Sequence, residues 1–354
     1  MEFRTQVTIE KPPFLIEPCE DILFVGSCFA DAIGQRFRDE AFPVTVNPFG
    51  VMYNPASILH TLQRLSATVP AVSPAVPVVA GGFAAVPAAS AAVPSPAVSG
   101  FPADTPVGSP ATVPAALAAG PRVAFLTLGT NHVYRLKATG EIVDNCEKRP
   151  AALFEEEELS VEQCADYLRQ CITLLRKMNP AVHVVFTVSP IRYRKYGYHA
   201  SQLSKATLLL ACSRCCSQCC NTVAATVPAV SPAVSGFPAD TPAGSPATVP
   251  AASAAGSVSY FPAYELLLDE LRDYRFYASD MLHPSAQAVE YIWERLVDSY
   301  FSPAAKDFLS EWRPLKQALA HKPFNPDSPD YRTFREQTLA KVAELQKKYP
   351  HLAL

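Results

Sequence analysis

The chain of 354 residues has 30 basic and 33 acidic side chains, and its net charge of −3 offers no electrostatic attraction for nucleic acid. No apolar run reaches the length of a membrane span, and residues 1–16 are charged and lack the apolar segment of a secretory signal. We therefore predict a cytoplasmic protein without nucleic-acid or membrane partners, and the oligomeric state is left open.

Two tracts of low complexity, residues 68–121 and 226–257, contain almost only Ala, Pro, Val, Ser, Gly and Thr. Within them, residues 98–120 and 234–256 are nearly identical, which indicates an internal duplication. Their frequent prolines disfavour regular helices and remove the N–H donors of strand ladders. We predict that both tracts are inserted loops that interrupt one fold.

The rest of the chain alternates short apolar runs with helical patterns. The apolar runs predict strands at residues 22–25, 42–46, 122–128, 182–188 and, as the last strand, 275–278. Apolar side chains at helical spacing predict helices at residues 29–39, 56–65, 161–179, 202–220, 264–271 and 284–300, and two more in the tail, at 304–319 and 331–348. Strands that alternate with helices indicate a parallel sheet with helices on both faces.

Three of the predicted strands end in polar residues. These ends are Gly26 and Ser27, residues 129–131 and residues 189–192. Because ligands of open parallel sheets bind beyond the carboxyl ends of the strands, we expect the functional site at this edge.

Ser27 lies on the turn between the first strand and the first helix, where the helix dipole and free N–H groups favour developing negative charge. This position suits a nucleophile, but a serine before a helix is also a preferred N-cap. The neighbouring Cys28 is an alternative nucleophile, since a thiol at a helix N-terminus has a lowered pKa. Its place inside the first helical turn favours burial instead.

A serine hydrolase also needs a base, a group that orients the base, and donors for the oxyanion. His283 and Asp280 lie on one loop, because His283 precedes a proline. We predict His283 as the base and Asp280 as its orienting carboxylate. The predicted oxyanion donors are the Ser27 N–H, the Asn131 amide and the Gly50 N–H.

Further side chains are candidate substrate contacts. They are Asn47, His132, Arg192 and His199. Two of these, Arg192 and His199, and also Lys205, either bind an anionic substrate or are solvated surface charges.

Five cysteines gather between Cys212 and Cys220. The cluster lacks a second spaced Cys or His pair, and some of its members share one helix face. We therefore expect inert or oxidisable thiols and no metal.

Residues 26–30 read Gly-Ser-Cys-Phe-Ala, the motif that names the GSCFA-domain proteins, and the chain resembles that family. The family in turn resembles the SGNH/GDSL hydrolases, whose early serine, glycine, Gly-x-Asn and late Asp-x-x-His are matched in order by Ser27, Gly50, residues 129–131 and residues 280–283. Residue 132 is His where the superfamily has Asp, and Val25 leads the Gly-Ser pair where the superfamily has Gly-Asp-Ser.

The resemblance implies a flavodoxin-like three-layer α/β/α fold and hydrolysis of esters without a cofactor. Substrates in the superfamily include acylated sugars, lipids and short esters, so the expected substrate is a small ester such as an O-acylated sugar. We expect the hydrolase domain over residues 1–302 and a helical extension over residues 303–354. The alternative is a binding module that keeps the fold but has lost catalysis.

Overall fold

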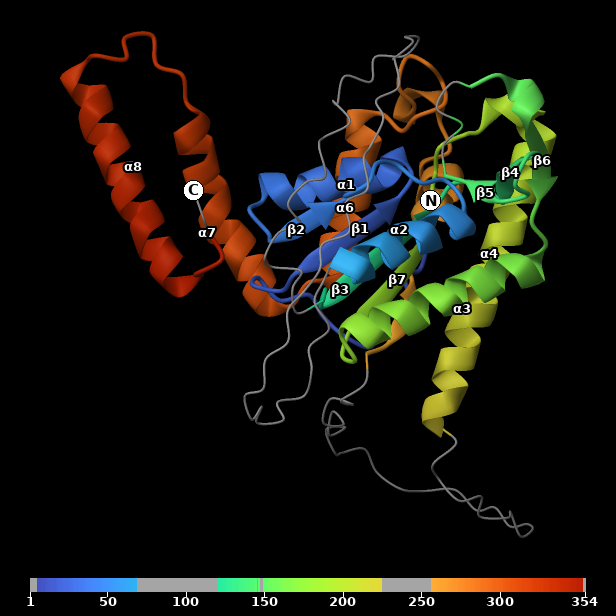
Figure 1. Ribbon diagram of the computed structural model, residues 1–354. Coiled ribbons are helices and arrows are strands. Elements are labelled where there is room, and N and C mark those ends of the chain that lie inside the picture. Colours follow the sequence, from blue (N-terminus) through green and yellow to red (C-terminus); the bar gives the residue numbers. More distant parts are fainter. Residues whose placement is uncertain (1–4, 69–119, 145, 147–148, 225–255, 353–354) are drawn as a thin grey trace, which may run out of the picture.

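A five-stranded parallel sheet forms the centre of the protein (Figure 1). The computed structural model describes residues 5–68, 120–144, 146, 149–224 and 256–352, so most of the two predicted insertions lies outside the described residues. The strands are β1 (Ile22–Gly26), β2 (Val44–Val46), β3 (Val123–Leu128), β7 (His183–Val188) and β8 (Val258–Tyr260). Their spatial order, β2-β1-β3-β7-β8, is the order typical of flavodoxin-like sheets, and it confirms the predicted fold class.

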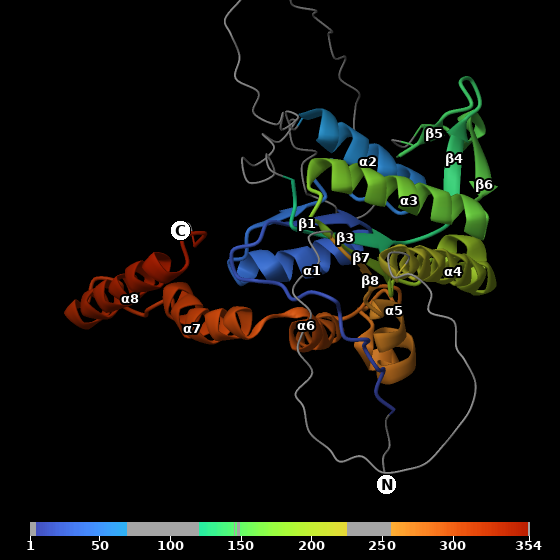
Figure 2. The same ribbon diagram turned by 90° about the horizontal axis from the view of Figure 1, so that it is seen from below.

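Helices cover both faces of the sheet. They are α1 (Cys28–Asp39), α2 (Pro55–Thr68), α3 (Val161–Met178), α4 (Gly197–Ala224) and α6 (Ala286–Tyr300). Figure 2 shows α2 and α3 on one side of the sheet and α1 and α6 on the other. The helix predicted from residue 161 has the expected capping box, in which the Ser160 and Gln163 side chains each accept from the other residue's N–H.

Strand periodicity explains the two cores. Leu23 and Val25 of β1 pack with α2 and α3, while the alternate residues Ile22 and Phe24 pack with α1 and α6. Both faces of the central strands are buried, which accounts for their continuous apolar sequences.

A second, antiparallel sheet was not predicted. Its strands β4 (His132–Leu136), β5 (Ile142–Val143) and β6 (Phe154–Glu158) lie in the order β5-β4-β6. The sequence of β6 is Phe followed by four Glu, and these side chains are largely exposed. A half-buried strand is recognised by apolar residues that alternate with polar ones, and the four successive Glu residues of β6 do not alternate in this way.

The last strand was predicted wrongly. Residues 275–278 begin in a short 3₁₀ turn, η5 (Tyr274–Phe276), because the Asp273 side chain accepts the Arg275 N–H and turns the chain. The last strand is β8, directly after the second tract. The helix expected from Pro284 begins two residues later, at Ala286, because the Ser285 side chain accepts the Ala288 N–H and is the N-cap of α6.

Short helices and a terminal hairpin complete the fold. The short helices are η2 (Ala151–Leu153), η3 (Arg194–Tyr196), α5 (Ala263–Glu265) and the π-helical turn η4 (Leu266–Leu271). The tail forms α7 (Pro303–Ala320) and α8 (Pro329–Lys348), capped by Ser302 and Ser328, and Figure 1 shows the pair projecting beside the sheet domain. The proposed limit between domains at residue 302 stays a prediction. No helix in the described part of the chain is both long enough and apolar enough to cross a membrane.

Gly26 closes β1 in a conformation that other residues avoid. Its φ is +152°, and a Cβ at this position would lie 2.2 Å from the Thr127 carbonyl oxygen of β3. We expect Gly26→Ala to lower the free energy of unfolding by about 3 kcal/mol or more, measured by chemical denaturation. The matched control is Gly50→Ala, which has a φ of +90° but nothing within 4 Å, and should cost about 1 kcal/mol. Equal losses in both variants would contradict the steric account.

Candidate active site

Ser27 lies where β1 turns into α1. Its backbone is extended, its side chain is 1% exposed, and its Oγ accepts the Phe29 N–H at 3.3 Å as the N-cap of α1. The capping role is therefore observed. The hydroxyl proton remains available for donation, because the cap uses Ser27 only as an acceptor.

Asn47 holds this turn from the neighbouring strand. Its Oδ1 accepts the Gly26 N–H at 2.8 Å, and its Nδ2 donates to Asp31 Oδ1 at 2.7 Å. Burial raises the pKa of Asp31, and the Asn47 hydrogen bond opposes that effect. Asn47, a predicted substrate contact, thus joins the end of β1 to the first turn of α1.

All three predicted oxyanion donors bond within the protein in this structure. The Ser27 N–H donates to the Thr127 carbonyl at 3.1 Å, the Gly50 N–H to the Asn47 carbonyl at 2.9 Å, and Asn131 Nδ2 to the Leu159 carbonyl at 2.8 Å. Asn131 keeps a second amide hydrogen. The oxyanion roles of Ser27 and Gly50 stay predictions, and they require these bonds to be exchanged for the substrate.

Asp280 and His283 form a close pair on one loop. Asp280 Oδ2 lies 2.5 Å from His283 Nδ1, and Asp280 Oδ1 accepts the N–H groups of Leu282 and His283 at 2.9 and 3.0 Å. Partial burial works against ionisation, but the N–H groups of His283 and Leu282, followed by the imidazole, lower the pKa of Asp280 to about 2. An ionised carboxylate can only accept, so Nδ1 carries a proton and Nε2 is the nitrogen that can act as a base.

Arg192 binds this loop to the end of β7. Its N–H donates to the Leu282 carbonyl at 3.0 Å, and its Nη1 donates to the Met281 carbonyl at 3.3 Å. The guanidinium also lies over the rings of Tyr198, Tyr277 and Tyr274, at 4.2, 5.4 and 5.8 Å from their centres. The loop is therefore held by the residue that was predicted to contact substrate.

Ser27 and His283 share one edge of the sheet but do not touch. No hydrogen bond joins Ser27 Oγ to His283 among the described residues. Ser27 follows β1 and Arg192 follows β7, with β3 between them, so their strands are two spacings of about 4.8 Å apart. The His283 side chain is 45% exposed, and its Nδ1 is held by Asp280.

The remaining predicted substrate contacts are His132 and His199. His132 is buried in β4, stacked on Tyr196 with ring centres 3.7 Å apart, and its Nδ1 lies 3.2 Å from Glu156 Oε1. His199 is exposed on the first turn of α4. Neither contacts Ser27 or His283 through an interaction that the structure shows.

Tyr53 is a neighbour of the turn that the sequence did not reveal. Its hydroxyl lies 3.3 Å from Cys28 Sγ, and burial, with the negative charge that a Cys28 thiolate would carry, raises the pKa of Tyr53. The thiol of Cys28 is only partly buried. The alternative nucleophile is thus next to a protonated phenol.

Lys205 and Ser204 hold the ends of β3 and β7 from α4. Lys205 Nζ donates to the carbonyls of Gly129 and Ser189 at 2.7 and 2.8 Å, and Ser204 Oγ accepts the Asn131 N–H at 2.9 Å. Lys205 is 3% exposed, and burial lowers its pKa to about 7. A signal existed in the sequence, because Ser204 and Lys205 fall on the buried stripe of α4 that continues through Leu208.

The cysteine cluster lies partly between α3 and α4. Cys212 and Cys215 are buried there, and burial raises the pKa of Cys212, so its thiol stays protonated. In the described part of the chain, no three Cys, His, Asp or Glu side chains are grouped closely enough to hold a metal ion. The side chains of Cys219 and Cys220 are outside the described residues.

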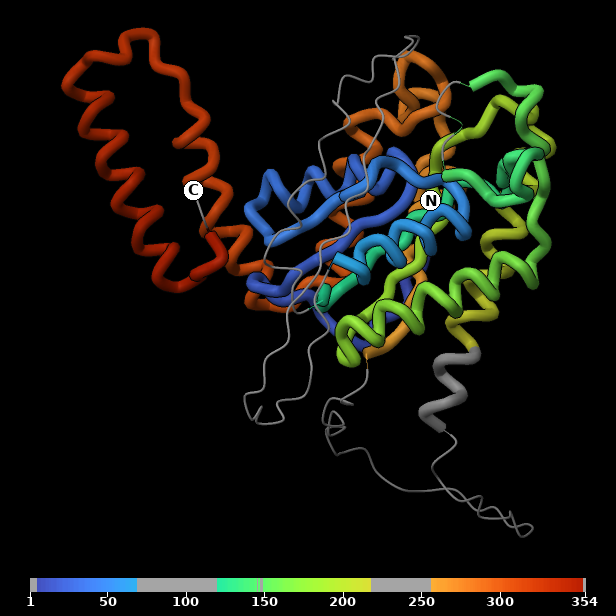
Figure 3. Tube along the Cα trace, viewed as in Figure 1, coloured from blue at the N-terminus to red at the C-terminus, as the bar shows by residue number. Residues whose placement is uncertain are grey.

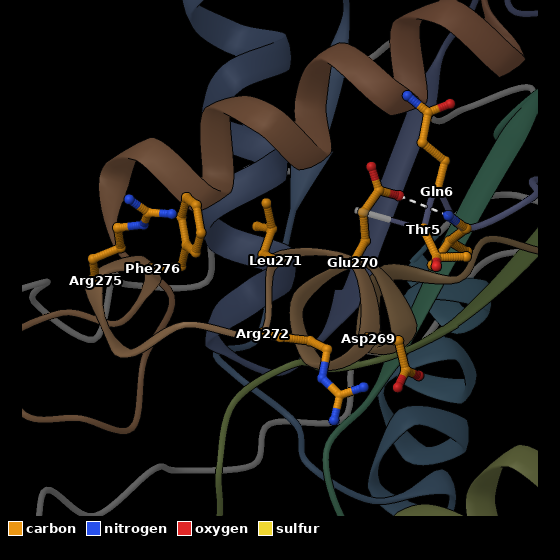
Figure 4. A pocket seen from close by; sticks show the side chains of 9 residues that line it. Thr5, Gln6, Asp269, Glu270, Leu271, Arg272, Arg275 and Phe276 are labelled. Atoms are coloured by element: carbon orange, nitrogen blue, oxygen red, sulfur yellow. Dashed lines mark hydrogen bonds between the residues drawn. The ribbon is translucent and has the colours of Figure 1, made fainter. Parts of the chain in front are cut away.

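A cavity of about 650 Å³ lies beside the N-terminal segment. It is lined by the N-terminal residues Thr5, Gln6 and Val7 and by Asp269, Glu270, Leu271, Arg272, Arg275 and Phe276 (Figure 4). The dashed line in Figure 4 is the Val7 N–H bond to Glu270 Oε2, 2.8 Å long. None of the candidate catalytic residues lines this cavity.

The fold and these side chains define an α/β/α protein with a serine and an aspartate–histidine pair at the carboxyl edge of a parallel sheet. Residues 21–224 and 247–296 match the GSCFA family, and residues 312–354 match the GSCFA domain protein, C-terminal domain. The chain therefore belongs to the GSCFA family, as its sequence resemblance indicated.

Two solved structures are similar at low identity. A protein provisionally described as a platelet activating factor from Streptococcus pneumonia is 14% identical with a TM-score of 0.37, over 81% of this chain and 85% of that chain. A carbohydrate esterase family 3 protein from Talaromyces cellulolyticus is 9% identical with a TM-score of 0.25, over 55% and 60%. At these identities the likeness concerns the fold alone. No curated protein matches the chain significantly.

The buried ammonium of Lys205 should make stability depend on pH. Lysine has a pKa of 10.5 in the reference state and about 7 here, so between these values the unfolded chain binds a proton that the folded protein does not. We expect the free energy of unfolding of the wild type, relative to Lys205→Met, to rise with pH over this range, by at most about 5 kcal/mol. Denaturant unfolding at several pH values measures this difference. Lys341→Met, an exposed control on α8, should run parallel to the wild type, and a parallel curve for Lys205→Met would refute the assignment.

Proposed function

We propose that this GSCFA protein is a serine hydrolase that cleaves an ester with Ser27, His283 and Asp280. The observation that carries the proposal is the Asp280–His283 pair, whose carboxylate oxygen and ring nitrogen are 2.5 Å apart. The pair lies on a loop bound to the carboxyl edge of the sheet, the edge at which Ser27 follows β1. Because Asp280 and His283 are three residues apart, a single turn of the backbone brings their side chains together. Ser27 and the pair come from opposite ends of the chain, and family membership supports reading them together.

The proposed reaction follows from the donors and acceptors at hand. Asp280 keeps the proton on His283 Nδ1, so Nε2 can take the proton of Ser27 Oγ as the oxygen attacks the ester carbonyl. The protonated imidazole then gives this proton to the leaving alkoxide, and an acyl-serine remains. In the second half of the reaction, His283 takes a proton from a water molecule as that water attacks the acyl carbonyl. The proton then passes to Ser27 Oγ, and the carboxylic acid is released.

The oxyanion of each tetrahedral intermediate needs donors near Ser27. The second amide hydrogen of Asn131 is one candidate. In the first turn of α1, the Phe29 N–H donates to Ser27 Oγ and the Ala30 N–H donates to the Ser27 carbonyl. The Cys28 N–H is therefore a second candidate. Such a donor contributes about 3 kcal/mol to the transition state.

The proposed substrate is a small ester, such as an O-acylated sugar, and the reaction needs no cofactor. We also propose that the protein acts in the cytoplasm without nucleic-acid or membrane partners, in keeping with its weak net charge.

A non-catalytic binding module is the second candidate. It is favoured by the absence of a Ser27–His283 hydrogen bond in the described structure and by the internal bonds of the Ser27 and Gly50 N–H groups. A broad panel of short esters separates the two functions, because a binding module would turn over none of them.

Ser27→Ala should reduce the hydrolysis of short p-nitrophenyl esters by at least about a thousandfold, since it removes the nucleophile. It also removes the cap of α1, at about 1 kcal/mol. Ser27→Asp keeps an oxygen that can cap α1 and should be equally inactive. Its inactivity would show that the loss of the nucleophile, and not the loss of the cap, stops hydrolysis. Cys28→Ala should remain active, and its inactivity beside an active Ser27→Ala would assign catalysis to the thiol.

Asp280→Asn should lower kcat/KM by about a thousandfold, because an amide no longer fixes the imidazole tautomer. Steady-state hydrolysis of the same esters measures the loss. The control is Asp273→Asn, an exposed capping aspartate on the preceding turn, which should keep nearly full activity. Equal activity of Asp280→Asn and the wild type would exclude the proposed triad.

A further inference from the structure

A small cavity lies beside the loop that carries Asp280 and His283. Its volume is about 40 Å³, and it is enclosed by the end of β7, the start of α4 and the helical segment 264–268. Arg192 and Lys205 both line it, and Tyr198 and Tyr264 contribute aromatic rings to its walls.

The cavity has two cations and no acid in its lining. Neither Arg192 nor Lys205 has a carboxylate within 4.0 Å among the described residues, whereas the buried Glu40 is paired with Lys316. An anion placed between these two basic side chains would be attracted to both.

The polar groups of the lining have donors to spare. Lys205 Nζ uses two of its three hydrogens, on the Gly129 and Ser189 carbonyls, and the Tyr264 ring centre lies 5.9 Å away. Within the part of the chain that the structure describes, the Arg192 side chain makes one hydrogen bond, to the Met281 carbonyl.

The neutral side chains of the lining are used as acceptors. Ser201 Oγ accepts the Tyr193 N–H at 3.3 Å, and Gln202 Oε1 accepts the Tyr264 hydroxyl. The remaining Ser201 O–H and Gln202 NH₂ hydrogens can donate to a ligand. A lining of donors suits an oxyanion and disfavours a cation.

We propose that this cavity binds a small oxyanion, about the size of a carboxylate, between Arg192 and Lys205. Its volume corresponds to a few water molecules on the scale where one water needs about 10–15 Å³, so a nucleotide or an intact sugar does not fit. The anion is either free in solution or the acidic end of a substrate. The site does not depend on ester hydrolysis, so it can be present whether or not the proposed function is correct.

Binding at this place would act on the candidate triad. Arg192 holds the Met281 and Leu282 carbonyls and would also contact the anion. An occupied cavity therefore braces the segment between Asp280 and His283 from outside the reaction centre.

Calorimetric titration of the full chain with sodium acetate, and separately with inorganic phosphate, tests the site at constant ionic strength set by chloride. We expect saturable binding at one site per chain with a dissociation constant in the millimolar range. Lys205→Met should weaken it by at least about tenfold, because it removes a buried charged donor. Arg214→Met is the matched control, since Arg214 lies on α4 outside the cavity and pairs with Glu162 of α3. This variant should bind as the wild type does. No saturable binding of either anion, or unchanged binding by Lys205→Met, would overturn the proposal.

A second variant keeps the test independent of folding. Gln202 is exposed at the rim, so Gln202→Glu adds a carboxylate beside both cations with little risk to the core. It should abolish acetate binding and raise the melting temperature, and unchanged acetate affinity would count against the site.

The source of the anion is decided by competition. If acetate competes with turnover of mono-p-nitrophenyl succinate but not of p-nitrophenyl acetate, the site takes the substrate's own carboxylate. If acetate binds without competing with either ester, the site takes a free anion.

Discussion

The ammonium group of Lys205 joins the two strands on which the candidate site rests. It donates to the last carbonyls at the ends of β3 and β7, and the adjacent Ser204 holds the Asn131 N–H. A buried lysine without hydrogen-bond acceptors would be strongly unfavourable, so these carbonyls and the lysine constrain each other. The strand end at Ser189 leads to Arg192, and Arg192 holds the loop of Asp280 and His283. One contact in the interior thus sets the relative positions of groups that are distant in sequence.

Most of the layered fold could be predicted, because its signals are local. The apolar runs of β1, β3 and β7 are long enough to show burial on both faces, and the Ser160 capping box marks the start of α3. β8 could not be predicted, since three residues after a low-complexity tract carry little pattern. Its place depends on contacts with β7, where the Val184 N–H donates to the Ser257 carbonyl. The charged strand β6 depends likewise on its partners, including the Arg135–Glu157 ion pair with β4.

The candidate site was predictable where chemistry follows from short spacing. Asp280 and His283 are three residues apart on a turn before a proline, and their pairing follows from that spacing. The fate of the oxyanion donors was not predictable, because the bond from the Ser27 N–H to Thr127 depends on the register of β1 against β3. The role of Arg192 was also hidden, since its partners at Met281 and Leu282 come from a segment about ninety residues away. The sequence predicts which residues form the candidate site, but the hydrogen bonds of their backbone groups depend on how the strands pack.

The two low-complexity tracts join the fold at the same edge of the parallel sheet. The first tract connects the end of α2 to the start of β3, and the second connects the end of α4 to the start of β8 (Figure 3). Near their junctions, Gly120 approaches the Met178 backbone and Gly256 approaches the Val182 backbone, both beside the start of β7. These junctions are at the amino edge of the parallel sheet, across the whole length of the strands from Ser27 and His283. A duplication between these elements therefore joins the fold at the edge away from the candidate catalytic residues, and it interrupts no strand or helix.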